Sequence, residues 1–302
     1  MALLVAGCAQ PTSTHHSADA ATPAHVPQTF PGIVLHTGQG DIVLVLYPQA
    51  APQTAALLTT LVKEHYYDGK SFGRVVPGHV IQQVERDGGT ATDDARRVPL
   101  EAPPGYHFSA GALGIARGAD PNSGGPEFFI MDYATSHLDG NYTVVGQVVE
   151  GLDVVHRIAR VPAVTFPAQA QLLTDRAALV PVQITTAELR DVALDGDQAA
   201  MLPLQVAQNN RTGEYRHSLE WPKDLVVGHA SQLTWYIRPY NETPSVDPGQ
   251  LSLQIDGAPV TLAPEAGYPD ILHFTWTPSA MGQHDAILSR NGTAWATLQI
   301  TL

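Results

Sequence analysis

The chain has 302 residues, of which 44% are hydrophobic and 15% are charged. These are globular proportions, and a chain of this length is expected to form two domains. The formal charge of −13, from 29 acidic and 16 basic residues, provides no basic patch for phosphates, which excludes nucleic acid as an expected partner. No apolar run approaches the roughly 20 residues of a membrane-spanning helix.

The single cysteine, Cys8, excludes an internal disulfide. It ends the segment Leu4-Val-Ala-Gly-Cys8, which resembles the lipobox of bacterial lipoprotein signals, where the cysteine is lipidated. The residues before it are too few for a whole signal, so we interpret residues 1–29 as a truncated signal and a flexible tether. This predicts a lipid-anchored protein of the bacterial cell envelope, facing the periplasm or the outside. The alternative is a chance Ala-Gly-Cys in a disordered tail.

The first folded segment begins near Phe30. Two β-branched runs on either side of Thr37-Gly-Gln-Gly-Asp41 predict a hairpin. Pro52 then opens a predicted helix that Gly69 ends, because proline suits a first helical turn and glycine a helix end. The apolar positions of this helix form one buried stripe: Leu57, Leu58, Leu61, Val62 and Tyr66.

A strand pattern returns at Ser71-Phe-Gly-Arg-Val-Val-Pro-Gly-His-Val-Ile-Gln82. Two further apolar runs follow between residues 107 and 130, divided by a polar loop. The second run ends the segment Asn122-Ser-Gly-Gly-Pro-Glu-Phe-Phe-Ile130, and Leu138-Asp-Gly140 and Val144-Val-Gly146 come after it. In this order and spacing, the motifs resemble the substrate groove of a cyclophilin-type peptidyl-prolyl cis-trans isomerase.

The resemblance covers roughly residues 30–190. It implies an eight-stranded antiparallel barrel capped by two helices, and a prolyl isomerase that needs no cofactor. Its partners would be proline-containing unfolded or exported polypeptides, whose folding prolyl isomerisation can limit. We expect the chain to be a monomer.

Rotation of an X-Pro bond needs no nucleophile, metal or proton shuttle, because its barrier is the loss of amide resonance. A catalyst must hold the proline ring and stabilise the twisted amide. The resemblance assigns the second task to Arg74, whose guanidinium stays charged and presents a rigid fork of donors. It makes Gln82 a residue that orients Arg74 or bonds a substrate carbonyl, and Phe129 the floor of the proline pocket. The neighbour Phe128 should face the core, since adjacent strand residues point to opposite faces.

The resemblance also implies the substrate-binding positions, several of which depart from the usual family residues. His79 stands in place of a phenylalanine that walls the pocket, and Glu127 in place of a glutamine. A polar ring weakens an apolar grip, and a carboxylate near Arg74 could compete with substrate. The alternative is therefore a catalytically weak proline-peptide binding module, or an envelope chaperone or scaffold. The full set of substrate-binding positions is His79, Val80, Ala116, Arg117, Glu127, His137, Leu138 and Tyr142.

A second helix is predicted over residues 152–159, and a closing strand over residues 180–186. Between them, residues 160–179 form an expected surface insertion. The acidic stretch 191–200 is the expected boundary, so the isomerase domain should span residues 30–195.

Residues 200–302 contain short strand candidates with the hairpin signals Asp256-Gly257 and Asn291-Gly292 between them. This spacing predicts a β-sandwich of immunoglobulin-like type and unknown role, with Trp235 in its core. The candidates span residues 215–221, 232–240, 251–255, 271–276, 285–288 and 295–302.

Metal handling is a further alternative, because the chain has 13 histidines and three of them, His15, His16 and His25, lie in the tether. No Cys/His cluster has the spacing of a zinc site. We therefore assign no metal.

Overall fold

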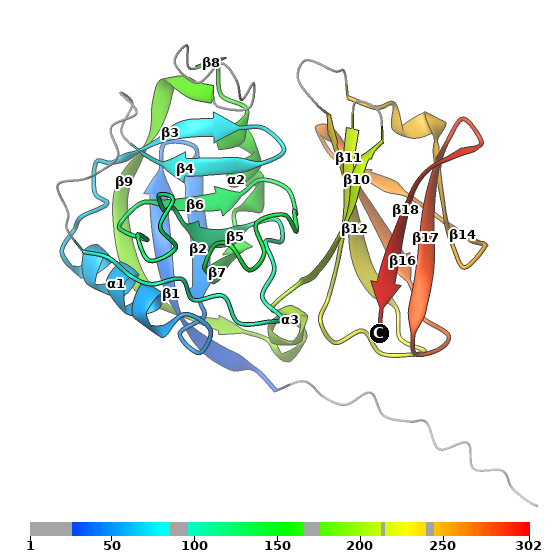
Figure 1. Cartoon of the computed structure of the whole chain (residues 1–302), viewed down its shortest axis with the longest axis horizontal. Coiled ribbons are helices and arrows are strands. Elements are labelled where there is room, and N and C mark those ends of the chain that lie inside the picture. The colour runs from blue at the N-terminus through cyan, green and yellow to red at the C-terminus, as the bar shows by residue number, and fades with distance from the viewer. Residues whose placement is uncertain (1–25, 85–95, 166–175, 213–214, 240–244) are drawn as a thin grey trace, which may run out of the picture.

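The computed structural model describes residues 26–84, 96–165, 176–212, 215–239 and 245–302. Cys8 and the tether histidines lie outside these ranges. The described chain forms a barrel followed by a C-terminal sandwich of two sheets (Figure 1). None of its helices is both long and apolar enough to span a membrane.

The barrel is a closed ring of eight antiparallel strands, which confirms the expected fold class. Pairing of β1 with β9 closes the ring, and the short β8 (Ala163–Thr165) extends β9 outside it. In spatial order the ring contains β1 (Gln28–Thr37), β2 (Gly40–Leu46), β7 (Val144–Glu150), β5 (Ala112–Ile115), β6 (Phe128–Met131), β4 (Val80–Gln83), β3 (Ser71–Val76) and β9 (Arg176–Leu194).

Two helices pack against the barrel, α1 (Pro52–Lys63) and α2 (Leu152–Ala159). Helix α1 begins at Pro52 as predicted, but it ends at Lys63, before the predicted stop at Gly69. The backbone of His65 is left-handed, with φ of 56°, and the N–H of Tyr66 bonds back to the carbonyl of Leu61. This bond closes the helix, so Tyr66 lies beyond its end.

Alternation along the strands divides the apolar residues of the barrel into two clusters. Phe128 belongs to an inner cluster with α1 and α2, whereas Phe129 belongs to a cluster on the other face of the sheet. We call the second group the outer cluster. It underlies the predicted groove, and Val80 and Phe129 are 2% and 5% exposed in it.

The closing strand β9 is longer than residues 180–186, because its C-terminal part pairs with β1 along the whole of that strand. Part of the expected insertion is also ordered sheet, since β8 and the start of β9 pair with each other. Residues 166–175 lie outside the described chain. After β9, Asp195 caps α3 (Gly196–Met201), which leads to the second unit.

The C-terminal sandwich has all six predicted strands, and both Asp-Gly and Asn-Gly pairs form turns. Trp235 is fully buried in a core shared by the two sheets. Polar β10 and the short β14 and β15 were not predicted, because they lack an apolar alternation. One sheet contains β10 (Gln205–Thr212), β11 (Tyr215–Trp221), β12 (Ser231–Pro239), β16 (Tyr268–Trp276) and β15 (Ala263–Glu265); the other contains β14 (Ala258–Val260), β13 (Leu251–Ile255), β17 (Gln283–Arg290) and β18 (Thr293–Thr301), with η2 (Pro248–Gln250) before β13.

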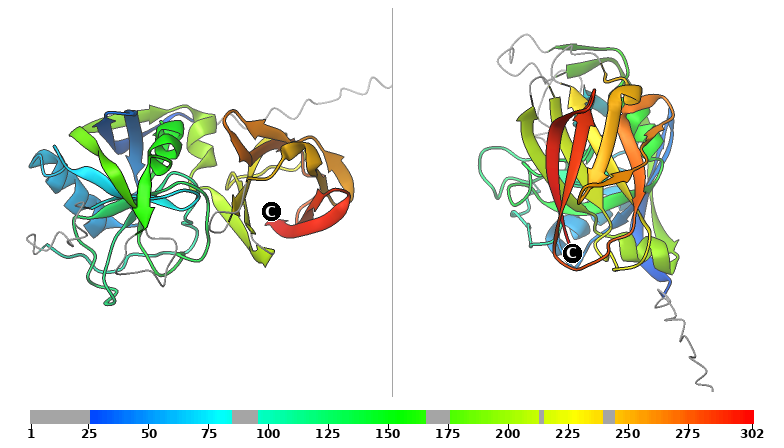
Figure 2. Two further views of the ribbon diagram at one scale, coloured as in Figure 1. Left: turned by 90° about the horizontal axis from the view of Figure 1, so that it is seen from above. Right: turned by 90° about the vertical axis from the view of Figure 1, so that its right-hand side faces the viewer.

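The sandwich lies beside the barrel, with the sheet that contains β10, β11 and β12 next to it (Figure 2). Tyr133 of the barrel donates a hydrogen bond to Asp270, and Ser218 donates one to the carbonyl of Ala134. The rings of Tyr133 and Tyr236 lie 5.1 Å apart across the same junction. Buried polar contacts and aromatic packing thus join the two units.

Candidate active site

The β3–β4 hairpin places Arg74 and Gln82 directly opposite each other. The Nη1 of Arg74 donates a hydrogen bond of 3.0 Å to the Oε1 of Gln82. Both side chains are half-buried, so the guanidinium is held in place while part of it stays accessible. Of the two roles predicted for Gln82, the structure contains the contact required to orient Arg74.

Beside this pair, the outer cluster brings several predicted pocket residues together: Val80, Ala116, Phe129, Leu138 and Tyr142. The ring of Phe129 stacks on Phe108 with centroids 5.5 Å apart, and meets the edge of Tyr142 at 6.0 Å. A Cβ on Gly114 would come within 2.3 Å of the Phe129 ring. Glycine is therefore required beneath this ring, whose position is fixed from several sides.

The loop after β5 contains Ala116 and Arg117. The N–H of Ala116 donates to the carbonyl of Glu127 over 2.9 Å, so peptide pairing at this residue would use its carbonyl oxygen. Arg117 donates from Nε to the carbonyl of Asn141, and its guanidinium lies 4.6 Å from the centre of the Tyr142 ring. Arg117 thereby holds the Tyr142 ring, which borders the predicted pocket.

His79 and His137 stack on each other, with ring centroids 5.5 Å apart and planes 28° apart. The Nδ1 of His79 is buried and has no hydrogen-bond partner within the described chain. Desolvation lowers the pKa of His79 well below its usual value, and nearby Arg238 lowers it further. Burial also lowers the pKa of His137. Both rings are therefore neutral at pH 7.

The sequence matches a known family over more than half of the chain. The family model described as "Cyclophilin type peptidyl-prolyl cis-trans isomerase/CLD" matches residues 33–189. The chain belongs to this family. The C-terminal sandwich lies outside the cyclophilin match.

Several relatives are similar to this cyclophilin domain. A protein named probable peptidyl-prolyl cis-trans isomerase from Brucella suis is 37% identical over 139 residues, which are 42% of this chain and 71% of the relative. The isomerase ppi1 of Schizosaccharomyces pombe is 38% identical over 135 residues, 42% of this chain and 83% of that protein. A solved cyclophilin-type isomerase of Cryptosporidium parvum aligns at a TM-score of 0.46 and 22% identity, covering 53% of this chain and 98% of that one.

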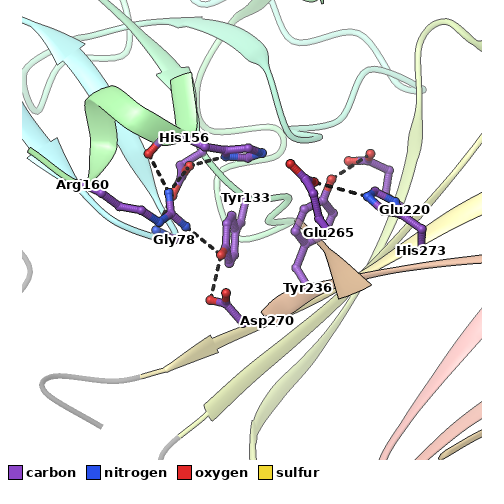
Figure 3. A network of polar contacts seen from close by, with 10 residues as sticks. Gly78, Tyr133, His156, Arg160, Glu220, Tyr236, Glu265, Asp270 and His273 are labelled. Carbon is purple, nitrogen blue, oxygen red and sulfur yellow. Dashed lines mark hydrogen bonds and ion pairs between the residues drawn. The ribbon is translucent and has the colours of Figure 1, made fainter. Parts of the chain in front are cut away.

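A polar network links the β3–β4 turn to the junction between the units (Figure 3). Fully buried Asp132 accepts hydrogen bonds from the N–H of Gly78, the Nδ1 of His156 and the Nη1 of Arg160. Burial opposes ionisation of this carboxyl, but the contacts with His156 and Arg160 hold its pKa below the usual value. Asp132 thus fixes the β3–β4 turn, which carries Gly78 and His79.

The network continues into the sandwich. The Nη2 of Arg160 donates to the hydroxyl of Tyr133 over 2.7 Å, and that hydroxyl donates to Asp270 over 2.7 Å. The guanidinium of Arg160 also lies 4.6 Å from the centre of the Tyr268 ring. The β3–β4 turn and the sandwich are therefore connected through consecutive hydrogen bonds.

Sequence patterns did not indicate two residues that lie near the β3–β4 turn, Arg216 and Arg238 of the sandwich. A Cβ on Gly78 would meet the Cγ of Arg238 at 2.8 Å, so this arginine stem lies directly over the groove turn. Arg216 faces Arg238 across the β11–β12 pair. The cyclophilin motifs end before both residues, and nothing in the sequence of the sandwich indicates its contact with the groove.

Among the described residues, no group of three or more His, Cys, Asp or Glu side chains is arranged to hold a metal ion.

Proposed function

We propose that this chain catalyses cis/trans isomerisation of X-Pro bonds, with Arg74 stabilising the twisted amide. The observation that carries this proposal is the Arg74–Gln82 hydrogen bond beside the outer cluster. When the C–N bond twists, its nitrogen regains a lone pair. A guanidinium held by Gln82 can donate a hydrogen bond to that nitrogen without first losing its own freedom of orientation.

The energetics require more than the arginine. An acceleration of about 10⁵ needs about 7 kcal/mol from the barrier of about 18–20 kcal/mol, and one preorganised donor typically supplies about 3–4 kcal/mol. We assign the remainder to the apolar pocket, which holds the proline and excludes water. Phe129 forms the floor of this pocket, and Val80, Leu138 and Tyr142 form its sides.

A second candidate function is peptide binding with little catalysis. The observation that favours it is His79, which brings a buried Nδ1 without a partner to the position before Val80. An unpaired buried polar atom weakens an apolar pocket. In this alternative, the groove still binds proline-containing segments of unfolded or exported polypeptides.

A protease-coupled assay on an Ala-Pro peptide tests the first proposal. Wild type should accelerate isomerisation, and Arg74→Ala should lose most of that acceleration, by about 10²- to 10³-fold as for other single preorganised donors. Arg190→Ala, an exposed position on β9, is the matched control and should behave like wild type. If wild type and Arg74→Ala both show only the uncatalysed rate, the isomerase proposal is contradicted. Peptide binding without catalysis then remains as the proposed function.

We also propose that Cys8 is lipidated and anchors the chain in a bacterial envelope, where it assists the folding of exported proteins. The support is the lipobox-like sequence Leu4-Val-Ala-Gly-Cys8 and the tether-like composition that follows it. Expression of the natural gene with labelled fatty acid, followed by detergent phase partition, tests this proposal. Label should enter wild type but not Cys8→Ser, and equal labelling would contradict it.

A further inference from the structure

We infer that Arg216 and Arg238 of the sandwich form a cationic wall of the prolyl groove, which selects client segments with an acidic side chain close to the proline. The inference deepens the proposed function and rests on the groove that it defines. It assigns a role in substrate selection to the part of the chain that the family match does not reach.

Strand alternation places both arginines on the face of the sheet that meets the barrel. On β11, Arg216 shares a face with Ser218 and Glu220. Ser218 donates to the carbonyl of Ala134, and Glu220 accepts from the N–H of Ala110 over 2.9 Å. Arg216 therefore extends the docked face toward the groove.

The neighbouring strand gives the same result. On β12, Arg238 follows Tyr236 on one face, and Tyr236 packs against Tyr133 of the barrel. Arg238 lies over Gly78, whose left-handed backbone (φ 69°) and lack of a Cβ leave room for the arginine stem. The wall thus begins at the turn that leads into β4.

The electrostatic environment of the two stacked histidines agrees with this placement of the wall. After desolvation, Arg238 is the largest influence lowering the pKa of His79, and Arg216 is the largest lowering that of His137, which Asp139 opposes. Arg74 also acts on His79. Arginines from both units therefore make the surroundings of His79 and His137 positive, although the chain as a whole carries a charge of −13.

The chemistry of this wall favours a carboxylate. A guanidinium presents a planar fork that matches a carboxylate, and its charge persists at every physiological pH. His79 and His137 are neutral, so the positive charge beside this part of the groove comes from the arginines. The junction contacts of Ser218 and Glu220 hold the wall in place before a client binds, which reduces the entropy cost of recognition.

The experiment compares kcat/KM on short blocked peptides, measured by exchange NMR so that no protease selects among them. Each peptide has Glu or Gln either two residues before the proline or directly after it. Wild type should prefer Glu at one of these positions by about five- to tenfold at low salt, the size expected for a charge pair at a partly screened site.

The Arg216→Gln/Arg238→Gln double variant should reduce this Glu/Gln ratio to about one, and higher salt should reduce it in wild type. The Arg190→Gln/Lys223→Gln variant removes two exposed charges elsewhere and should keep the ratio. A wild-type ratio near one at both positions, or a ratio that survives in the double variant, overturns the inference. If the double variant does not fold, the wild-type salt dependence decides.

Failure of the proposed function is distinguishable from failure of this inference. If wild type catalyses nothing on any peptide, the isomerase proposal fails, and the Glu/Gln preference is then measured as a ratio of peptide Kd values by calorimetry. Tighter binding of the Glu peptide that is lost in the double variant still supports the wall. Equal Kd values for the two peptides contradict it.

Discussion

The Nη1 of Arg74 donates a hydrogen bond to the Oε1 of Gln82, 3.0 Å away, between residues that face each other across the β3–β4 pair. The contact uses one of the five N–H donors of the guanidinium. It also ties the orientation of the arginine to a strand rather than to a loop. The proposed mechanism depends on this fixed orientation.

Gln82→Ala should lower kcat/KM by about tenfold, because Arg74 would have to be ordered in each catalytic event. The free energy of unfolding should change by only about 1 kcal/mol, as for a partly exposed hydrogen bond. Peptide isomerisation rates and chemical denaturation measure the two effects. Unchanged kcat/KM would show that Gln82 does not position Arg74.

Gly114→Ala should displace the Phe129 ring, since the new Cβ would lie 2.3 Å from it. We expect kcat/KM to fall at least tenfold, mainly through a higher KM, and stability to fall by about 1–3 kcal/mol, as in overpacked cores. Gly105→Ala has open space at its Cβ, but its left-handed backbone (φ 86°) strains any residue other than glycine. It therefore lowers stability without touching Phe129 and controls for stability loss alone. An unchanged KM in Gly114→Ala would show that Phe129 is not the floor of the pocket.

His79→Phe should strengthen the pocket in two ways. It removes a buried Nδ1 that has no partner in the described chain, which should raise stability by about 1 kcal/mol. It also restores an apolar wall, so KM for an Ala-Pro peptide should fall by a few-fold. A lower activity in this variant would show that the histidine itself contributes to the reaction.

The pKa of Glu220 determines how the free energy of unfolding depends on pH. Burial raises its pKa from 4.5 to about 7, although hydrogen bonds from Ala110 and Tyr236 oppose the rise. The protonated form is therefore favoured in the folded protein. Its contribution to stability is complete below pH 4.5 and is lost as pH rises through about 7.

Relative to Glu220→Gln, wild type should lose on the order of 2 kcal/mol of unfolding free energy between pH 5 and pH 8. Denaturant titrations followed by tryptophan fluorescence measure this difference, since all four tryptophans lie in the sandwich. A glutamine can accept from the N–H of Ala110 with its oxygen and donate from its amide nitrogen to the Tyr236 hydroxyl, as the protonated carboxyl does, so it isolates the charge. If the free energy of unfolding depends on pH in the same way in both proteins, the pKa of Glu220 is not raised by burial.

The barrel was predictable because its signals are local and repeated. Pro52 marks the start of α1, and the pattern around Phe128 and Phe129 separates the two faces of β6. The end of α1 was not predictable, since His65 adopts a left-handed backbone that favours glycine. Strand β9 exceeded its prediction because its length is set by the partner β1 rather than by its own sequence.

The groove was predictable only where family motifs reach it. The motifs indicated Arg74, Gln82 and Phe129, and the structure places them near one another along β3, β4 and β6. Arg216 and Arg238 could not be found this way, because their proximity to Gly78 depends on how the sandwich docks. That docking depends on paired contacts such as Tyr133 with Asp270, and neither partner alone signals the other.

The central claim is that Arg74 lowers the barrier to rotation and is not needed merely to hold the peptide. Exchange NMR on one Ala-Pro peptide measures both quantities, the cis/trans exchange rate on the protein and the Kd. For Arg74→Ala, the account predicts an on-protein exchange rate lower by about 10²-fold or more with a Kd within a few-fold of wild type. An unchanged exchange rate in Arg74→Ala, or a loss explained wholly by weaker binding, would contradict it.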